Sequence, residues 1–558
     1  MAITSTFLTP KTLWENFTAD KPLKISKINE VRYDKITYGE YYFSGRDVDG
    51  ESVRIFGVYA TPDEKKKYSA VLYIPDVTDT INFEVIREYV KLGYAVLAVD
   101  IYGERAGVEN YTSYPKSVYY ANYEKRGNYM DYVEETAKKT SWYEWVCVER
   151  FAISFLKNQP NVDKIGVIGV KDGANIAWQI AATDDRIACS VMLFGAGWKA
   201  YTSVPRYGDQ SQEIPMNEER RRFIAAVEAH AYAQSVTCPI LFLSATNNDK
   251  FDFDRSFDTL LRIPEKIDCS FNYSPGFKEY LDGFCEKDVE LFLKKYLSGS
   301  DVTFPKAPEL EVKQDGTFFD ITVKCDGQDK VAECKVYVNE GVEDPSLRNW
   351  MPCEQKETDG ELNFEYVVSG NTSKIFAFAV VKYKSGVTVS SRFLYKNIQP
   401  STAKKSGLVY TSRDGLDGIT FYDKNATEIK SIFVNRDEFI KLVKGADGIS
   451  GAYSHCGLIS YRFGEPSWRI DERSILKFDL YTNEFCVLRL IFMQKTASGT
   501  QEFVYTTEIK AGSIWQNIVV KIGEFKSAEG MSIRKYDDIY ALRIEGDGKY
   551  AVNNILLI

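Results

Sequence analysis

Residues 45–300 alternate between apolar strand-like runs and stretches with helical spacing. The runs lie at 53–60, 70–75, 94–100, 164–169, 189–195, 239–245 and 269–273. The helix-like stretches lie at 82–92, 141–158, 173–182, 217–235, 252–262 and 285–297. The central runs show no polar alternation, which is typical of parallel strands covered by helices on both faces. This order predicts an α/β domain with a mostly parallel sheet and right-handed crossovers.

The pattern changes at residue 303, where a linker-like segment enters a series of short alternating runs. Between 308 and 398 these runs are separated by turns, without a helix-length segment, which predicts a sandwich of the immunoglobulin or fibronectin III kind. A second β-rich stretch begins at 408, with its clearest strands at 475–482, 485–494, 501–509, 517–522, 539–546 and 553–558. Their length and spacing favour a jelly-roll sandwich. We expect three domains, 1–302 (with an N-terminal extension), 303–400 and 401–558.

Charge and apolar run length exclude some classes of partner. The chain has 70 Lys and Arg against 79 Asp and Glu, a net charge of −9. The basic runs Lys65–Lys67 and Arg220–Arg222 adjoin acidic residues, so we interpret them as solvated surface. A chain without a basic stripe is a poor candidate for binding nucleic acid or an anionic membrane. No apolar run reaches the about 18 residues of a membrane span, so neither partner is expected.

The start of the chain and its cysteines bear on the compartment. The first residues, MAITSTFLTPKTLW, contain no basic segment followed by an apolar one, so no signal peptide is predicted. We expect a cytoplasmic protein, or an extracellular one if a leader was removed before this numbering begins. The ten cysteines are scattered and form no CxxC pair, which favours a reducing compartment.

Only two histidines are present, His230 and His455. Any histidine-based catalytic triad must use one of them, and a multi-histidine metal site is excluded. His230 lies in a helix-like stretch before the run 239–245, and His455 lies in the C-terminal β-rich stretch. Both positions favour a structural histidine over a catalytic one. No metal ligand set and no cofactor are predicted.

The most informative motif follows the run 164–169 and reads Gly169-Val170-Lys171-Asp172-Gly173. Its glycines are spaced as in G-x-S-x-G, the sharp strand-to-helix turn that presents a nucleophile at the carboxyl end of a sheet. Small residues are needed there because the central residue has a strained backbone and neighbouring chains pack closely. Lys171 stands where the serine would be.

Other segments extend this similarity: DIYGERAG (100–107), YTSYP (111–115), TSWYEWVCVERFAISFL (140–156) and PILFLSATNND (239–249). With the glycine motif, they make residues 45–300 resemble an α/β-hydrolase of the acetyl xylan esterase and dienelactone hydrolase type. The resemblance implies a triad in the order nucleophile, acid, histidine. It places the nucleophile at Lys171, the acid at Asn248 beside Asp249, and the histidine in the turn Ser274-Pro275-Gly276. Of these positions, only Asp249 retains a usable residue.

Several roles remain open for the residues at this motif. Lys171 can pair with a carboxylate, such as Asp249 or Asp76, across a former active site. It can also act as a nucleophile if burial lowers its pKa, although Asp172 beside it favours the charged form. Asp172 is one position out of register for a nucleophile. We favour the ion pair.

Aromatic residues in the segments that resemble the esterase rim predict a pocket. They are Tyr102, Tyr111, Tyr114, Trp142, Tyr143 and Trp145, with Asp76 and Asp172 nearby. Aromatic faces suit stacking against sugar rings or phenolic acids. The alternative is that about half of them pack the helices.

Residues 408–558 resemble a galactose-binding-like carbohydrate-binding module. The resemblance is carried by ILKFDLYTNEFCVLRLIFM, WQNIVVKIGEFKS (515–527) and YAVNNILLI (550–558), including Trp515, Phe525 and Asn553-Asn554. The candidate sugar contacts are Tyr453, Arg462, Trp468 and Arg469, since an aromatic ring and an arginine can stack on and hydrogen-bond a sugar. The resemblance also implies a structural calcium, but no acidic ligand cluster is visible. The alternative is that this domain only packs against its neighbours.

Three functions follow from these observations. The leading hypothesis is an esterase-like domain that lacks the Ser-His-Asp triad, in a catalytically inactive protein that recognises a glycan or glycan ester. The second is an active carbohydrate-ester or small-ester hydrolase that uses non-standard residues. The third is a structural or protein-interaction protein. The sequence leaves the sugar and the oligomeric state open.

Overall fold

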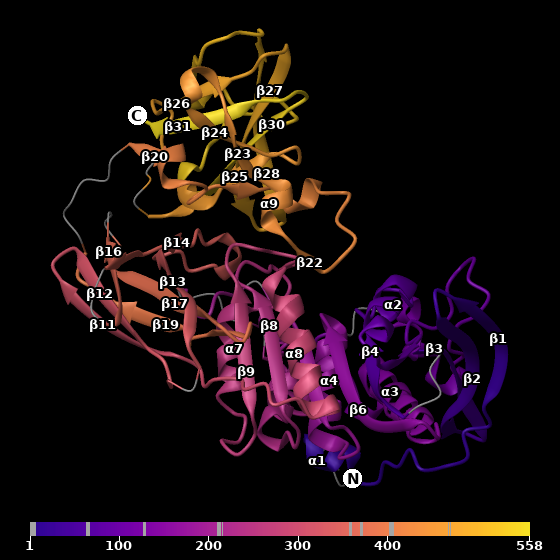
Figure 1. Cartoon of the computed structure of the whole chain (residues 1–558). Coiled ribbons are helices and arrows are strands. Elements are labelled where there is room, and N and C mark those ends of the chain that lie inside the picture. The colour runs from indigo at the N-terminus through magenta and orange to yellow at the C-terminus, as the bar shows by residue number, and fades with distance from the viewer. Residues whose placement is uncertain are drawn as a thin grey trace.

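The computed structural model describes residues 7–62, 67–126, 130–202, 204–208, 214, 216–327, 329–356, 360–368, 372–400, 407–466, 468 and 470–558. Figure 1 shows an N-terminal α/β unit, a middle β unit beside it, and a C-terminal β unit that lies over both. The predicted fold class, an α/β-hydrolase domain followed by all-β domains, is confirmed. No helix in the described part of the chain is long and apolar enough to cross a membrane.

A nine-stranded sheet forms the α/β unit, in the order β1-β2-β3-β5-β4-β6-β7-β8-β9. Its strands are β1 (Ser26–Tyr33), β2 (Ile36–Val48), β3 (Glu51–Pro62), β4 (Tyr68–Ile74), β5 (Ala95–Val99), β6 (Val162–Val170), β7 (Cys189–Leu193), β8 (Ile240–Ala245) and β9 (Cys269–Ser274). Strands β4 to β9 pair in parallel, whereas β1 to β3 are antiparallel. The seven predicted strands are all present. The hairpin β1–β2 was not predicted, because β1 is exposed along its whole length and carries no apolar run.

Apart from α1, which the sequence did not predict, the helices of this unit lie close to their predicted positions. They are α1 (Pro10–Trp14), α2 (Phe83–Lys91), α3 (Ser141–Lys157), α4 (Asp172–Thr183), α5 (Glu218–Ala226), α6 (Ala229–Tyr232), α7 (Phe253–Leu260) and α8 (Phe284–Ser298). The single helix expected over 217–235 is wrong. It breaks at Glu228, whose backbone is extended (φ −61°, ψ 133°). The Glu228 carboxylate accepts the N–H of Ala200, 3.0 Å away, and this contact holds the chain in the break.

Two antiparallel sheets enclose the core of the middle unit, as the alternating runs predict. One sheet contains β11 (Glu309–Asp315), β12 (Phe318–Lys324), β15 (Glu354–Lys356) and β16 (Leu362–Val367). The other contains β13 (Val331–Glu340), β14 (Met351–Pro352), β17 (Lys374–Tyr383), β18 (Thr388–Ser390) and β19 (Leu394–Asn397). Inward residues of both sheets, such as Phe319, Val336 and Phe364, form one buried cluster.

The C-terminal unit also has two sheets. The first contains β20 (Leu408–Tyr410), β23 (Lys441–Lys444), β24 (Ser450–Tyr453), β26 (Ile475–Tyr481), β29 (Gln516–Lys521) and β31 (Ala551–Leu557). The second contains β21 (Thr420–Phe421), β25 (Leu458–Ser460), β27 (Cys486–Thr496), β28 (Gly499–Ile509) and β30 (Ile539–Gly546). One segment leaves this unit: β22 (Phe433–Val434) pairs in parallel with β10 (Leu281–Asp282) of the α/β unit, just before the short helix α9 (Arg436–Phe439).

Buried polar contacts join the α/β unit to the middle unit. The guanidinium of Arg348 donates to both carboxylate oxygens of Asp254 on α7, and neither side chain is exposed to solvent. Asp288 on α8 accepts the backbone N–H of Thr388 at 2.8 Å and the side-chain amide of Asn272 at 2.9 Å. Polar groups that are buried and satisfied in this way fix one relative orientation of the two units.

Candidate functional site

The turn between β6 and α4 has the geometry of a nucleophile elbow. Lys171 has φ 54° and ψ −116°, and its N–H donates to Leu193 O at 2.8 Å. A Cβ on Gly169 would lie 2.4 Å from Gly173 O, and one on Gly173 would lie 2.2 Å from Pro75 O. Glycine is therefore required at both positions. The sharp strand-to-helix turn that the sequence predicts is present, with a lysine at its centre.

A second lysine, which the sequence motif does not indicate, lies beside this turn. Nζ of Lys199, from the short 3₁₀ helix η4 (Lys199–Tyr201) after β7, is 2.7 Å from Oδ1 of Asp172. Asn175 donates to the same oxygen at 3.2 Å. The ammonium of Lys199 also lies 5.7 Å from the ring centroids of Trp142 and Phe251. Lys199 therefore pairs with the acidic residue of the elbow.

The expected ion pairs of Lys171 are not found. Oδ2 of Asp249 lies 3.6 Å from Nζ of Lys424 in the C-terminal unit, so it pairs across the domain boundary. Among the described residues, no carboxylate lies within 4 Å of Nζ of Lys171. Its charge acts on Asp76 at longer range. Burial and the charge of Asp172 raise the pKa of Asp76 to about 6, while Lys171 opposes that shift.

Asn248, at the predicted acid position, organises the loop after β8. Its side-chain amide donates to Lys278 O at 2.6 Å, and its side-chain oxygen accepts the N–H groups of Lys250 and Phe251 at 2.8 and 2.9 Å. These contacts shape the loop through backbone groups alone. They explain why an amide is accommodated here, where the triad would need a carboxylate.

The turn after β9, where the resemblance places the histidine, contacts the C-terminal unit. Ser274 is buried, and its hydroxyl accepts the N–H of Asp282 at 2.8 Å and contacts Sγ of Cys285. The carbonyl of Pro275 accepts from the guanidinium of Arg436 on α9. The polar atoms of this turn therefore have structural partners.

The two histidines lie elsewhere in the fold. The ring of His230 stacks on Trp198 with 3.9 Å between centroids, and burial lowers its pKa to about 3. It is therefore neutral and packed within the α/β unit. His455 lies on the C-terminal unit and contacts the carboxylate of Glu428.

The aromatic residues of the predicted rim are mostly buried. Trp142, Trp145, Tyr114 and Tyr143 belong to the core of the α/β unit. Tyr102 and Tyr111 are partly exposed. The ring of Tyr102 is covered by Tyr123, 5.0 Å between centroids, and by the guanidinium of Arg105. The alternative that these rings pack the helices thus explains most of them, and ligand contact by Tyr102 and Tyr111 stays a prediction.

The candidate sugar contacts of the C-terminal unit also have internal partners. The buried Trp468 donates its indole N–H to Glu465 at 3.0 Å, and Arg462 donates to Val409 O at 2.6 Å. Tyr453 packs edge-on against Tyr550. Arg469 lies outside the described residues. Trp468 is buried, so its internal contacts explain its presence, and sugar binding by this group stays a prediction.

A cleft of about 1120 Å³ opens where the three units meet. The α/β unit contributes the loop after β8, from Asn248 to Asp252, together with Thr202, Val204 and Lys278. The middle unit contributes residues 344–347, and the C-terminal unit contributes Tyr422, Lys424 and parts of the segment 493–540. The cleft therefore lies at the carboxyl end of β8, on the side where open α/β sheets bind ligands.

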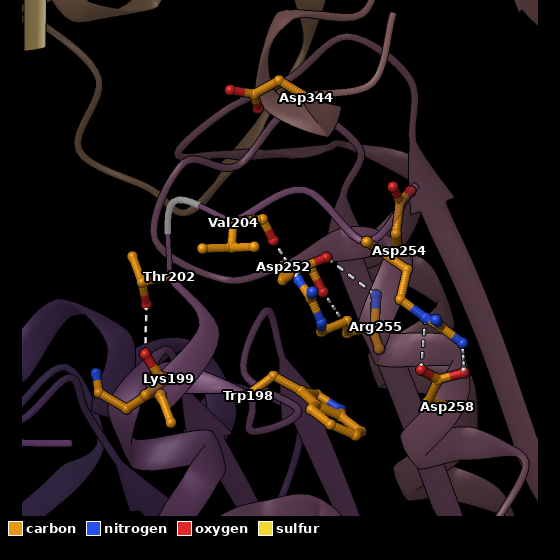
Figure 2. A network of polar contacts seen from close by, with 12 residues as sticks. Trp198, Lys199, Thr202, Val204, Asp252, Asp254, Arg255, Asp258 and Asp344 are labelled. Atoms are coloured by element: carbon orange, nitrogen blue, oxygen red, sulfur yellow. Dashed lines mark hydrogen bonds and ion pairs between the residues drawn. The ribbon is translucent and has the colours of Figure 1, made fainter. Parts of the chain in front are cut away.

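One wall of this cleft is continuous with the elbow. Figure 2 shows the hydroxyl of Thr202 donating to Lys199 O, and Arg255 bridging Asp252 and the carbonyl of Val204. The segment that sends Lys199 to the elbow thus also lines the cleft. The sequence does not reveal the cleft, because its walls come from residues about 300 positions apart that share no motif.

One group of potential metal ligands occurs among the described residues: Glu428, His455 and Cys456. Its donors are an oxygen, a nitrogen and a sulfur. Calcium is held by six to eight oxygen ligands, so this cluster does not fit the calcium that the resemblance implies.

Comparisons with known proteins give one family match and several similar solved structures. Residues 55–267 match the model of the dienelactone hydrolase family. Similar solved structures include the acetyl xylan esterase from Paenibacillus sp. R4, with 16% identity and a TM-score of 0.40 over 52% of this chain and 92% of that chain. Acetyl xylan esterase 1 from Thermoanaerobacterium sp. JW/SL YS485 has 16% identity and a TM-score of 0.39, over 51% and 92%. Est1E from Butyrivibrio proteoclasticus has 15% identity and a TM-score of 0.32, over 46% and 98%.

A search of curated proteins finds no match to the chain. The family match falls on the sheet and helices that carry the elbow. Residues 55–267 are therefore similar to the dienelactone hydrolase family and have an α/β-hydrolase-like fold, and antiparallel β units follow them in this chain.

Proposed function

We propose that this protein binds a carbohydrate or carbohydrate ester in the cleft between its three units and does not hydrolyse esters through a serine triad. The main observation against serine-hydrolase activity is Lys171. It has the strained backbone conformation of a nucleophile position but no nucleophilic oxygen.

The other triad positions support the same conclusion. A serine hydrolase needs a base within about 2.6–3.2 Å of the nucleophile to take its proton. Asn248 is committed to backbone contacts, and Pro275 meets Arg436. His230 is stacked on Trp198 and neutral. No residue of this group supplies the general base.

The cleft supports recognition of a polar ligand. Its volume matches an oligosaccharide-sized ligand better than a single small ester, since sites for drug-sized ligands span about 300–1000 Å³. Its lining offers hydroxyls, amides and charged groups, including Thr500, Gln501 and Arg534, which can pair with sugar hydroxyls. Tyr422 and Tyr540 also line the cleft, but both side chains are largely buried, so polar groups make up most of the surface that a ligand would meet.

The test is binding of the full chain to an array of neutral and acetylated oligosaccharides, followed by calorimetry with each hit. Gln501→Ala and Arg534→Ala should each weaken binding at least several-fold. Gln399→Ala and Arg413→Ala, at exposed positions away from the cleft, should leave it unchanged. If no glycan binds and a protein partner co-purifies instead, an interaction role replaces this proposal.

A second candidate, hydrolysis by non-standard residues, is favoured by Asp76. Its pKa of about 6 lies near neutrality, as that of a general base does, and the charge of Lys171 acts on it. This candidate predicts turnover of p-nitrophenyl acetate that Lys171→Ala or Asp76→Asn abolishes without lowering the thermal unfolding temperature. Turnover no greater than that of a denatured control would exclude it.

A further inference from the structure

Two loops of the C-terminal unit bring three potential ligands together at its surface. Glu428 lies between β21 and β22, and His455 and Cys456 lie in the turn between β24 and β25. Nε2 of His455 contacts Oε1 of Glu428, and Sγ of Cys456 is 3.7 Å from the same oxygen. All three donor atoms lie within 4.8 Å of one another.

Contacts outside the cluster hold both loops in place. The N–H of Tyr422 donates to Gly457 O at 2.9 Å, which joins the start of the first loop to the second. The N–H of Cys456 donates to the hydroxyl of Ser454 at 3.2 Å. The ring of Phe439 stacks on His455 with 5.7 Å between centroids. The ligand atoms therefore converge without rearrangement of the backbone.

The donor set selects the class of ion. Imidazole nitrogen, cysteine sulfur and carboxylate oxygen together suit Zn²⁺ and its first-row neighbours, whereas Ca²⁺ and Mg²⁺ take oxygen ligands. Three protein ligands leave one position of a tetrahedral ion for water. The side chains of His455 and Glu428 are each nearly half exposed, so water and metal can reach them.

The cluster also sits on the segment that connects two units. Five residues after Glu428 comes β22, whose residues Phe433 and Val434 pair with Leu281 and Asp282 of β10 in the α/β unit. A bond from Glu428 to His455 and Cys456 would therefore fasten this connecting segment to its own sandwich, next to its contact with the α/β unit.

We propose that Glu428, His455 and Cys456 form a binding site for Zn²⁺ or a similar first-row transition ion, which clips the segment 426–435 to the C-terminal sandwich. This site is independent of the ligand cleft and of the elbow.

The first experiment measures metal binding by the full chain after dialysis against a chelator. Calorimetry with Zn²⁺ should give one site, and Co²⁺ should give the near-ultraviolet charge-transfer band of a cobalt–thiolate bond. Cys456→Ser should abolish the band, and Glu428→Gln, at an exposed position, should weaken binding at least tenfold. Cys325→Ser and Glu438→Gln, at positions outside the cluster, are the controls and should match the wild type. Zn²⁺ binding that is absent, or that is equal in the Cys456→Ser variant and the wild type, would overturn the site.

The second experiment measures amide hydrogen exchange with and without Zn²⁺. Exchange in the segment 426–435 should slow by at least several-fold in the wild type and stay unchanged in Glu428→Gln. Metal binding with unchanged exchange would overturn the clip.

Discussion

Nζ of Lys199 lies 2.7 Å from Oδ1 of Asp172, the residue that directly follows the elbow lysine. Asp172 is thus paired with a lysine from the loop after β7. Lys171 instead occupies the strained central position of the turn. This arrangement assigns the two lysines different roles, which substitutions can separate.

The backbone of Lys171 predicts an unusual stability effect. Its φ of 54° favours glycine, and a non-glycine residue in such a conformation costs about 1–3 kcal/mol. Lys171→Gly should raise the free energy of unfolding by about 1 kcal/mol, and Lys171→Val should lower it by about 1–3 kcal/mol because a branched Cβ fits this region worst. Urea unfolding of the purified variants measures both.

Lys157→Gly provides the control for that pair. Lys157 is an exposed residue in the last turn of α3, with ordinary helical geometry, so glycine should cost about 0.5–1 kcal/mol there. Destabilisation by glycine at both positions would contradict a strained elbow.

A serine placed at the elbow should not by itself give esterase activity. In Lys171→Ser the hydroxyl would have no imidazole to take its proton, because the turn at 274–276 contains no histidine. The variant should show no burst of p-nitrophenol from p-nitrophenyl acetate and no labelling by a fluorophosphonate probe. Stoichiometric labelling would show that another group supplies the base.

Breaking the contact of Arg348 with Asp254 should lower the free energy of unfolding more than most single substitutions in the chain. Arg348→Met leaves a buried carboxylate without its partner, and breaking such a pair costs about 3–5 kcal/mol. Scanning calorimetry should show the loss. Arg206→Met is the matched control, because Arg206 pairs with Asp258 on the same helix but is partly exposed. It should cost less than about 1 kcal/mol. Equal losses would mean that burial does not set the energy.

His230 predicts a dependence of stability on pH. Burial against Trp198, with the charge of Arg262 nearby, lowers its pKa from 6.5 to about 3. Between these values the unfolded chain binds a proton that the folded chain does not, so stability falls as the pH falls. The neighbouring Glu228, with a pKa raised from 4.5 to about 7 by burial, contributes with the opposite sign and masks the effect in the wild type.

The contribution of His230 is therefore measured as the difference in stability between the wild type and the variant His230→Phe. His230→Phe keeps a ring against Trp198 and removes the titration. As the pH falls from 6 to 4.5, the free energy of unfolding of this variant relative to the wild type should rise by about 1.4 kcal/mol per pH unit. Urea unfolding measures it. A difference that does not change with pH would mean that His230 is protonated in the fold.

The sequence predicts strands β3 to β9 of the α/β unit and β26 to β31 of the C-terminal unit to within a few residues, because buried strands such as β6 and β8 are continuous apolar runs. It does not predict the exposed β1 with its partner β2, or the short strands between β20 and β25. It also predicts the elbow, since Gly169 and Gly173 are required by local backbone contacts. It could not predict that Lys199 pairs with Asp172, or that Asp249 pairs with Lys424, because those partners meet only through the tertiary fold. Trp468 was assigned to a ligand by residue type, and burial is a property that residue type does not give.

The pairing of β22 with β10 has a consequence for how the chain folds during synthesis. Leu281 is fully buried, and its strand partner Phe433 lies about 150 residues further along the chain. An α/β unit that folds as it emerges from the ribosome completes its nine-stranded sheet before β22, the partner strand of β10, has been synthesised. At a synthesis rate of about 5–20 residues per second, β10 remains without its partner strand for on the order of ten seconds. That interval is when the nascent protein is most exposed to chaperones and to unwanted strand pairing.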